Sequence, residues 1–138
     1  MDLENTLKKI AVDFNYTTGK WIAAVPWHRA DETWQKIVEH VLSGYFSGDD
    51  VTHVVVKARQ SGADNPNNLR GNFVIDLASI MVCTRDWTDG RRTKVVGKKL
   101  MELNLDVAAW KYKPNVISLL SYDNNNKKYR FPYIYTFP

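Results

Sequence analysis

The chain has little of what several classes of protein require. It contains one cysteine, Cys83, among 138 residues, which excludes an internal disulfide and any cysteine-rich zinc site and favours an intracellular location. No apolar run approaches the roughly 20 residues that a membrane-spanning helix needs. Residues 1–4 also lack the basic and apolar regions of a signal peptide. We therefore expect a cytoplasmic protein that has no contact with a membrane.

Signatures of catalysis are also scarce. No phosphate-binding glycine-rich loop and no nucleophile elbow occurs. The three histidines, His28, His40 and His53, have no metal-ligand spacing. Asp86 and Asp89 stand three apart at a predicted helix start, where capping and the helix dipole explain them better than acid–base chemistry does. The sequence therefore predicts no catalytic residue, no metal site and no cofactor.

The chain is long enough for one globular domain, residues 1–138, with 44% apolar and 25% charged residues. Its charge is uneven. Residues 1–50 carry five basic and eight acidic side chains, whereas residues 51–138 carry fourteen and seven. The basic excess favours an anionic partner, such as a nucleotide, a nucleic acid or a phosphorylated peptide, on the C-terminal two thirds.

The stretch of residues 80–89 is the one around which the rest of the chain is organised. Residues 80–84 have the apolar, β-prone character of a strand. A polar turn follows, and Asp89 or Thr88 is placed to cap a helix over residues 90–103. The inner face of that helix is predicted to consist of Val95, Val96, Leu100 and Leu103.

Two more helices are predicted. Residues 2–12 have apolar residues at helical spacing, with Asp2 as the cap. Asp31 is predicted to cap a longer helix, whose apolar stripe makes Trp34 a core residue. The stripe comprises Trp34, Ile37, Val38, Val41, Leu42 and Tyr45.

Strands are predicted at residues 20–25, 51–58, 106–112, 116–122 and 129–135, with a hairpin turn at 123–126 and a long loop at 60–72. Residues 73–77 either pair or form a turn before the strand of residues 80–84. Because no long alternation of strand and helix occurs, the order favours an α+β fold with one mainly antiparallel sheet backed by two or three helices.

Several basic side chains fall on predicted strands or at their ends: Lys20, Lys57, Arg59 and Lys113. Lys57 and Arg59 are two residues apart, so on a strand they point to the same face. Cations held by a sheet have fixed positions, which suits the recognition of phosphate oxygens. The alternative is that these side chains lie on a solvated face and pair with carboxylates.

Several short motifs, taken in order, resemble those of the basophilic-leukaemia-expressed protein family. They are Gly19-Lys20-Trp21, Asp31-x-x-Trp34-x-x-Ile37, Thr84-x-Asp86-x-Thr88-Asp89, Tyr112-Lys113-Pro114 and Pro132-x-x-Tyr135. Together they extend over about residues 17–136. Members of that family are sometimes labelled phosphothreonine lyase domains. The loop of residues 60–72 departs from the family, because it is longer.

That family is in turn similar to translation initiation factor 4E, which binds the messenger-RNA cap. The resemblance implies a curved antiparallel sheet backed by helices. The strand of residues 54–59 resembles the strand on which that factor holds the triphosphate of the cap, so Lys57 and Arg59 are the implied phosphate contacts. The tryptophans that stack on the cap have no counterpart among the eighteen residues before Gly19. Trp27 and Trp87, in loops, either supply a substitute stacking platform or pack in the core.

The candidate ligand-binding residues are Lys20, Trp27, His28, Lys57, Arg59, Arg85, Trp87, Tyr112 and Lys113. Three functions stay open. The first is a non-enzymatic binding protein for a phosphorylated ligand, above all a nucleotide that it sequesters. The second is a lyase acting on phosphoproteins, with a lysine as base and His28 or His53 as acid. The third is an RNA- or protein-interaction module without a small ligand. No oligomeric state follows from the sequence.

Overall fold

The structure is a computed structural model that describes residues 3–46, 50–61, 74–107, 109–120 and 135–137. None of the helices in these ranges is long and apolar enough to cross a membrane. The elements are α1 (Leu3–Asp13), β1 (Gly19–Pro26), the 3₁₀ turn η1 (Trp27–Arg29), α2 (Ala30–Leu42), β2 (Val51–Ser61), β3 (Val74–Thr84), α3 (Gly90–Glu102), β4 (Trp110–Pro114), α4 (Asn115–Leu120) and β5 (Tyr135–Phe137).

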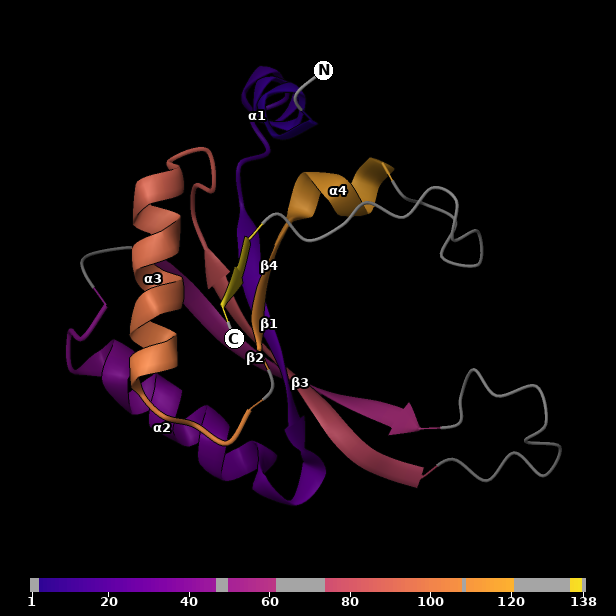
Figure 1. The fold of residues 1–138 in the computed structure, drawn as a ribbon, viewed down its shortest axis with the longest axis vertical. Coiled ribbons are helices and arrows are strands. Elements are labelled where there is room, and N and C mark those ends of the chain that lie inside the picture. Colours follow the sequence, from indigo (N-terminus) through magenta and orange to yellow (C-terminus); the bar gives the residue numbers. More distant parts are fainter. Residues whose placement is uncertain (1–2, 47–49, 62–73, 108, 121–134, 138) are drawn as a thin grey trace, which may run out of the picture.

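The five strands form one sheet in the order β2-β3-β1-β4-β5, and every neighbouring pair is antiparallel. Figure 1 shows α2 and α3 together on one side of this sheet, while α1 and α4 contact each other near one end of β1 and β4. The predicted α+β class, with an antiparallel sheet backed by helices, is confirmed. We call the sheet face opposite α2 and α3 the open face.

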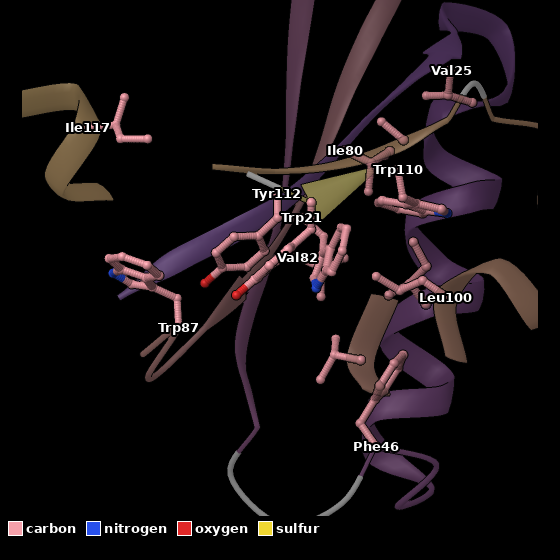
Figure 2. Close-up of a cluster of buried hydrophobic side chains, with 14 of the residues drawn as sticks. Trp21, Val25, Phe46, Ile80, Val82, Trp87, Leu100, Trp110, Tyr112 and Ile117 are labelled. Carbon is pink, nitrogen blue, oxygen red and sulfur yellow. The ribbon is translucent and has the colours of Figure 1, made fainter. Parts of the chain in front are cut away.

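Trp21 of β1 is the centre of the core on the helix side. Its ring is fully buried, meets the ring of Tyr112 edge-on with centroids 5.1 Å apart, and donates from Nε1 to the carbonyl oxygen of Thr93 at 3.0 Å. Figure 2 shows Trp21, Tyr112 and Val82 gathered at the middle of the buried cluster. These contacts join α3 to the two central strands.

Gly19 and Thr84 make room for Tyr112 at the end of the sheet. The Tyr112 hydroxyl lies 2.5 Å from the Thr84 hydroxyl, and a Cβ atom at Gly19 would lie only 2.1 Å from the same Tyr112 oxygen. Glycine is therefore required at the start of β1 because the tyrosine side chain occupies the space that any other side chain would need.

The predicted strand at residues 116–122 is wrong, because the chain forms α4 over Asn115–Leu120. Asn115 is held against the residue before β1, with its backbone N–H donating to the Thr18 carbonyl at 2.9 Å. The consecutive residues Val116 and Ile117 are both buried, which suits a helix and not an alternating strand. Tertiary packing thus overrides the β-propensity of the segment.

The predicted strand at 106–112 is shifted, because β4 spans Trp110–Pro114. The predicted strand at 129–135 and the hairpin turn at 123–126 lie almost wholly outside the described residues, and β5 begins at Tyr135. Asp2, the predicted cap of α1, and most of the loop at 60–72 also lie outside them.

The predicted start of α2 is also wrong. The helix begins at Ala30, and the capping residue is Arg29, whose side chain makes no capping hydrogen bond. Asp31 lies instead in the first turn, where a carboxylate is favourable to the helix dipole.

The apolar stripe predicted for α2 coincides only in part with its buried face, since Ile37 is buried and Val41 and Tyr45 pack against the core. The helix buries Ala30, Thr33 and Ile37, whereas Leu42 is 81% exposed and Trp34 is 38% exposed. Trp34 is therefore not a core residue. The Trp34 indole instead reaches the edge strand β2, where it donates to the Val54 carbonyl at 3.0 Å.

Other predictions are confirmed. The Asp89 side chain caps α3 by accepting a hydrogen bond from the backbone N–H of Arg92 at 3.2 Å. Val96 and Leu100 are buried, although Val95 is 41% exposed. The strand predicted at 80–84 is the C-terminal half of β3, which pairs with β1 on one side and with β2 on the other.

We expect Gly97→Ala to destabilise the protein by about 1–3 kcal/mol, through overpacking. A Cβ atom at Gly97 would lie 2.4 Å from the Trp21 ring and 2.8 Å from that of Phe137. On an exposed helix surface the same change stabilises by about 1 kcal/mol. Urea denaturation measures the free energy of unfolding, and the exposed neighbour Lys98→Ala is the control. A stabilised Gly97→Ala protein would contradict this packing of α3.

Alkaline pH should weaken the fold through Tyr135. Burial, together with the hydrogen bond to Glu4 at 3.0 Å, raises the pKa of Tyr135 from 10.0 to about 12. An unfolded tyrosine ionises near 10, so this stabilisation is complete below pH 10 and is lost as pH rises through 12. Tyr135→Phe should reduce the loss of unfolding free energy between pH 10 and pH 12, by up to about 3 kcal/mol. Parallel curves of unfolding free energy against pH would argue against this role.

Candidate functional site

The direction of Trp21 decides which side chains lie on the open face. Trp21 contacts α3 through Thr93 and Gly97. Successive residues of a strand point to opposite faces, so Lys20 and Ile22 lie on the open face. Burial follows this alternation along the whole of β1, with every second residue buried and those between them half-buried. The open face is therefore partly accessible.

Four side chains form a row across the open face. Lys20 of β1 is the register partner of Lys113 of β4 and of Cys83 of β3. Cys83 in turn is the partner of His53 of β2. Because partners on adjacent strands point to the same face, these four residues form one line over four strands, which we call the basic row.

The electrostatics of the basic row favour an anion. Lys20 and Lys113 are both half-buried, and like charges directly opposite each other on neighbouring strands are destabilising. No ion pair joins Lys20 to a carboxylate in the described part of the chain. Burial raises the pKa of the Cys83 thiol, and the positive charge of Lys20 opposes that rise. An oxyanion can accept charge-assisted hydrogen bonds from lysines that lie opposite each other on one sheet face.

Lys57 lies on the same face but away from the basic row. Its side chain is exposed, and its register partner is Ser79, which pairs in turn with Ala24. Two strand spacings and four residues separate Lys57 from Lys20, about 17 Å. The backbone of Arg59 continues β2 opposite Leu77, but its side chain lies outside the described residues. Lys57 therefore cannot share one phosphate group with Lys20.

Trp27 and His28 lie in η1, past the end of β1 that is remote from Lys20. The Trp27 ring is 43% exposed, and the His28 side chain is exposed. The structure does not bring these two residues to the basic row.

Trp87 and Tyr112 are core residues. Both are fully buried, so neither has a surface on which a ligand can stack, and of the two alternatives for Trp87 the structure shows packing in the core. Figure 2 shows Trp87 at the margin of the buried cluster. Its Nε1 atom has no hydrogen-bond partner in the part of the chain that the structure describes.

Arg85 lines a pocket of about 420 Å³ at the end of β3 and the start of α3. The other lining residues are Asp50, Thr84, Asp86, Asp89, Arg92, Thr93 and Val96. The charges in this pocket already serve the fold. Arg92 forms an ion pair with Asp50, Asp89 caps α3, and Asp86 accepts from the backbone N–H of Thr88 at 2.9 Å.

The three carboxylates disfavour a phosphate in this pocket, because they offset both arginines and already complete the N-terminus of α3. No group of three or more histidine, cysteine, aspartate or glutamate side chains suitable for a metal ion occurs among the described residues. An anionic ligand is thus better accommodated by the basic row than by the pocket.

Sequence reasoning missed the residues that surround Lys20. The sequence suggests a role for His53 only as the acid of a lyase, and it gives Met81 and Lys111 no role in binding. Their position depends on the pairing of β1 with β3 and β4, which places Met81 and Lys111 on either side of Ile22. The alternation within each strand was readable from the sequence, whereas the register between strands was not.

Comparison with models of protein families finds no matching family, and comparison with curated protein sequences finds no significant match.

We expect Trp21→Phe to be more destabilising than Trp87→Phe by about 2 kcal/mol, although both remove one ring from the core. The first change breaks a buried hydrogen bond, whereas the second removes a donor whose burial without a partner costs about 1–3 kcal/mol. Urea denaturation of both variants gives the difference. Equal losses would mean that the Trp87 indole has a partner in solution.

Proposed function

We propose that this protein binds a phosphorylated ligand, above all a nucleotide, on the open face of its sheet, and that it sequesters the ligand without catalysing a reaction. The observation that carries the proposal is the direct opposition of Lys20 and Lys113 on β1 and β4. Both side chains are half-buried, so holding them around a bound ligand costs less side-chain entropy than it would for fully exposed lysines.

Phosphate suits this pair because its oxygens accept charge-assisted hydrogen bonds from both lysines at once. The helices α2 and α3 lie on the other face of the sheet (Figure 1), so they do not cover the side chains of Lys20 and Lys113, which are half-buried. We also propose that the fold resembles that of initiation factor 4E, since a helix-backed antiparallel sheet is compatible with that fold. In this proposal Lys57 and Arg59, the phosphate contacts that the resemblance implies, bind a second and more distant phosphate.

One observation favours the lyase as a second candidate. Of the two histidines that could act as its acid, His53 lies in the basic row with Lys20, whereas His28 lies in η1. A lysine and a histidine near one phosphate are the groups that proton abstraction and phosphate departure need. Loss of phosphate from a phosphothreonine peptide, detected by mass spectrometry, would favour this candidate over simple binding.

The test is a thermal-shift screen with nucleoside mono-, di- and triphosphates, followed by titration of the strongest ligand. A ligand at 100 times its dissociation constant should stabilise the protein by about 2.7 kcal/mol. We expect the double variant Lys20→Ala, Lys113→Ala to bind at least about a hundredfold more weakly, because two hydrogen bonds to charged groups contribute about 1.5–3 kcal/mol each.

The matched control is Arg91→Ala with Lys98→Ala, two exposed residues of α3 on the other side of the sheet. Both double variants lower the net charge from +4 to +2, so a general electrostatic effect would weaken binding equally in both. Equal weakening, or a screen in which no phosphorylated ligand shifts the melting temperature, contradicts the proposal.

A further inference from the structure

An apolar row lies beside the basic row on the open face. Ile22 of β1 is the register partner of Met81 of β3, and Met81 is the partner of Val55 of β2. Ile22 and Met81 are half-buried, and Val55 is 38% exposed. All three point to the same side as Lys20 and Cys83, since each lies two residues along its strand from a member of the basic row.

The dimensions of the two rows follow from the geometry of the sheet. Residues two apart on a strand are separated by about 7 Å, so this is the distance from the basic row to the apolar row. Three neighbouring strands make the apolar row about 10 Å wide. It is thus broad enough for one flat ring system.

The chemistry of the apolar row suits an aromatic ring. The Met81 thioether is polarizable and makes favourable contacts with aromatic rings, and the branched side chains of Ile22 and Val55 flank it. Ser79 and His53 neighbour the row along β3 and β2, where they can hydrogen-bond to the edge of a ring. Partial exposure of the three apolar side chains leaves apolar area to be buried by a ligand.

We propose that the ligand carries a flat aromatic ring joined to its phosphate through a spacer, as in a nucleoside 5′-phosphate. The ring lies on Met81 between Ile22 and Val55, and the phosphate lies between Lys20 and Lys113. The separation of about 7 Å between the rows favours a ring held away from the phosphate by a sugar over a ring bonded to it directly, as in phosphotyrosine. This inference rests on the proposed function and adds to it the residues that hold the ring.

The test compares the dissociation constants of adenosine 5′-monophosphate, ribose 5-phosphate and phenyl phosphate, measured by titration calorimetry. We expect the nucleotide to bind roughly tenfold or more tightly than either of the others, because only it fills both rows. Met81→Gln keeps the length of the side chain and replaces its thioether by a polar amide. It should weaken nucleotide binding roughly tenfold and leave ribose 5-phosphate unaffected.

Further variants separate the two proposals. Lys20→Ala with Lys113→Ala should weaken the binding of all three ligands. Met81→Leu keeps an apolar surface and should retain most of the nucleotide affinity. Unchanged binding of ribose 5-phosphate by Met81→Gln shows that this variant is folded. Equal affinity for the nucleotide and ribose 5-phosphate, with no effect of Met81→Gln, overturns the ring site and leaves phosphate binding intact. Tightest binding of phenyl phosphate also overturns it. Binding of none of the three overturns both proposals.

Discussion

The contact of Trp21 with α3 is the constraint on which the remaining structure depends. Its indole donates to a carbonyl inside the helix, its ring meets Tyr112 on the neighbouring strand, and Gly97 is the residue that lets the helix approach. A strand has only two faces, so fixing Trp21 against the helix also fixes its neighbours Lys20 and Ile22 on the opposite side. The packing of the core therefore also determines which side chains of β1 lie on the open face.

The register between neighbouring strands determines which side chains lie next to each other on the open face. Antiparallel pairing of β1 with β4 sets Lys20 against Lys113, and pairing with β3 sets Ile22 against Met81. A slip of one residue in either pairing would move every side chain of the slipped strand to the other face. A slip of β4 would bury a lysine beside Trp21, and a slip of β3 would replace Val82 there by Met81 or Cys83. The burial of Trp21 and Tyr112 excludes such a slip energetically, so the same aromatic pair that stabilises the core also positions the two lysines.

The parts of the fold that local chemistry determines were predictable. Asp89 caps α3 as its position in a polar turn predicts, and the strand predicted at residues 20–25 is β1, which extends it by one residue at each end. The failures have one cause, which is packing between distant segments. Trp34 lies outside the core and donates to the carbonyl of Val54 on β2. The helix α4 forms where the sequence favours a strand, and it packs against α1.

The candidate site also has a part that the sequence predicts and a part that depends on packing between distant segments. Lys20 and Lys113 were recognisable as strand cations, but their opposition is a property of the register and of no segment alone. Arg85 illustrates the converse, since it lies in a well-formed pocket whose carboxylates already neutralise the neighbouring Arg92 and cap the helix. A pocket whose charges are paired internally has little left to offer an anion, whereas Lys20 forms no ion pair with a carboxylate in the described ranges and lies directly opposite a second lysine. This difference in how the charges are already paired, more than depth or volume, is why our proposal places the phosphate on the open face and not in the pocket.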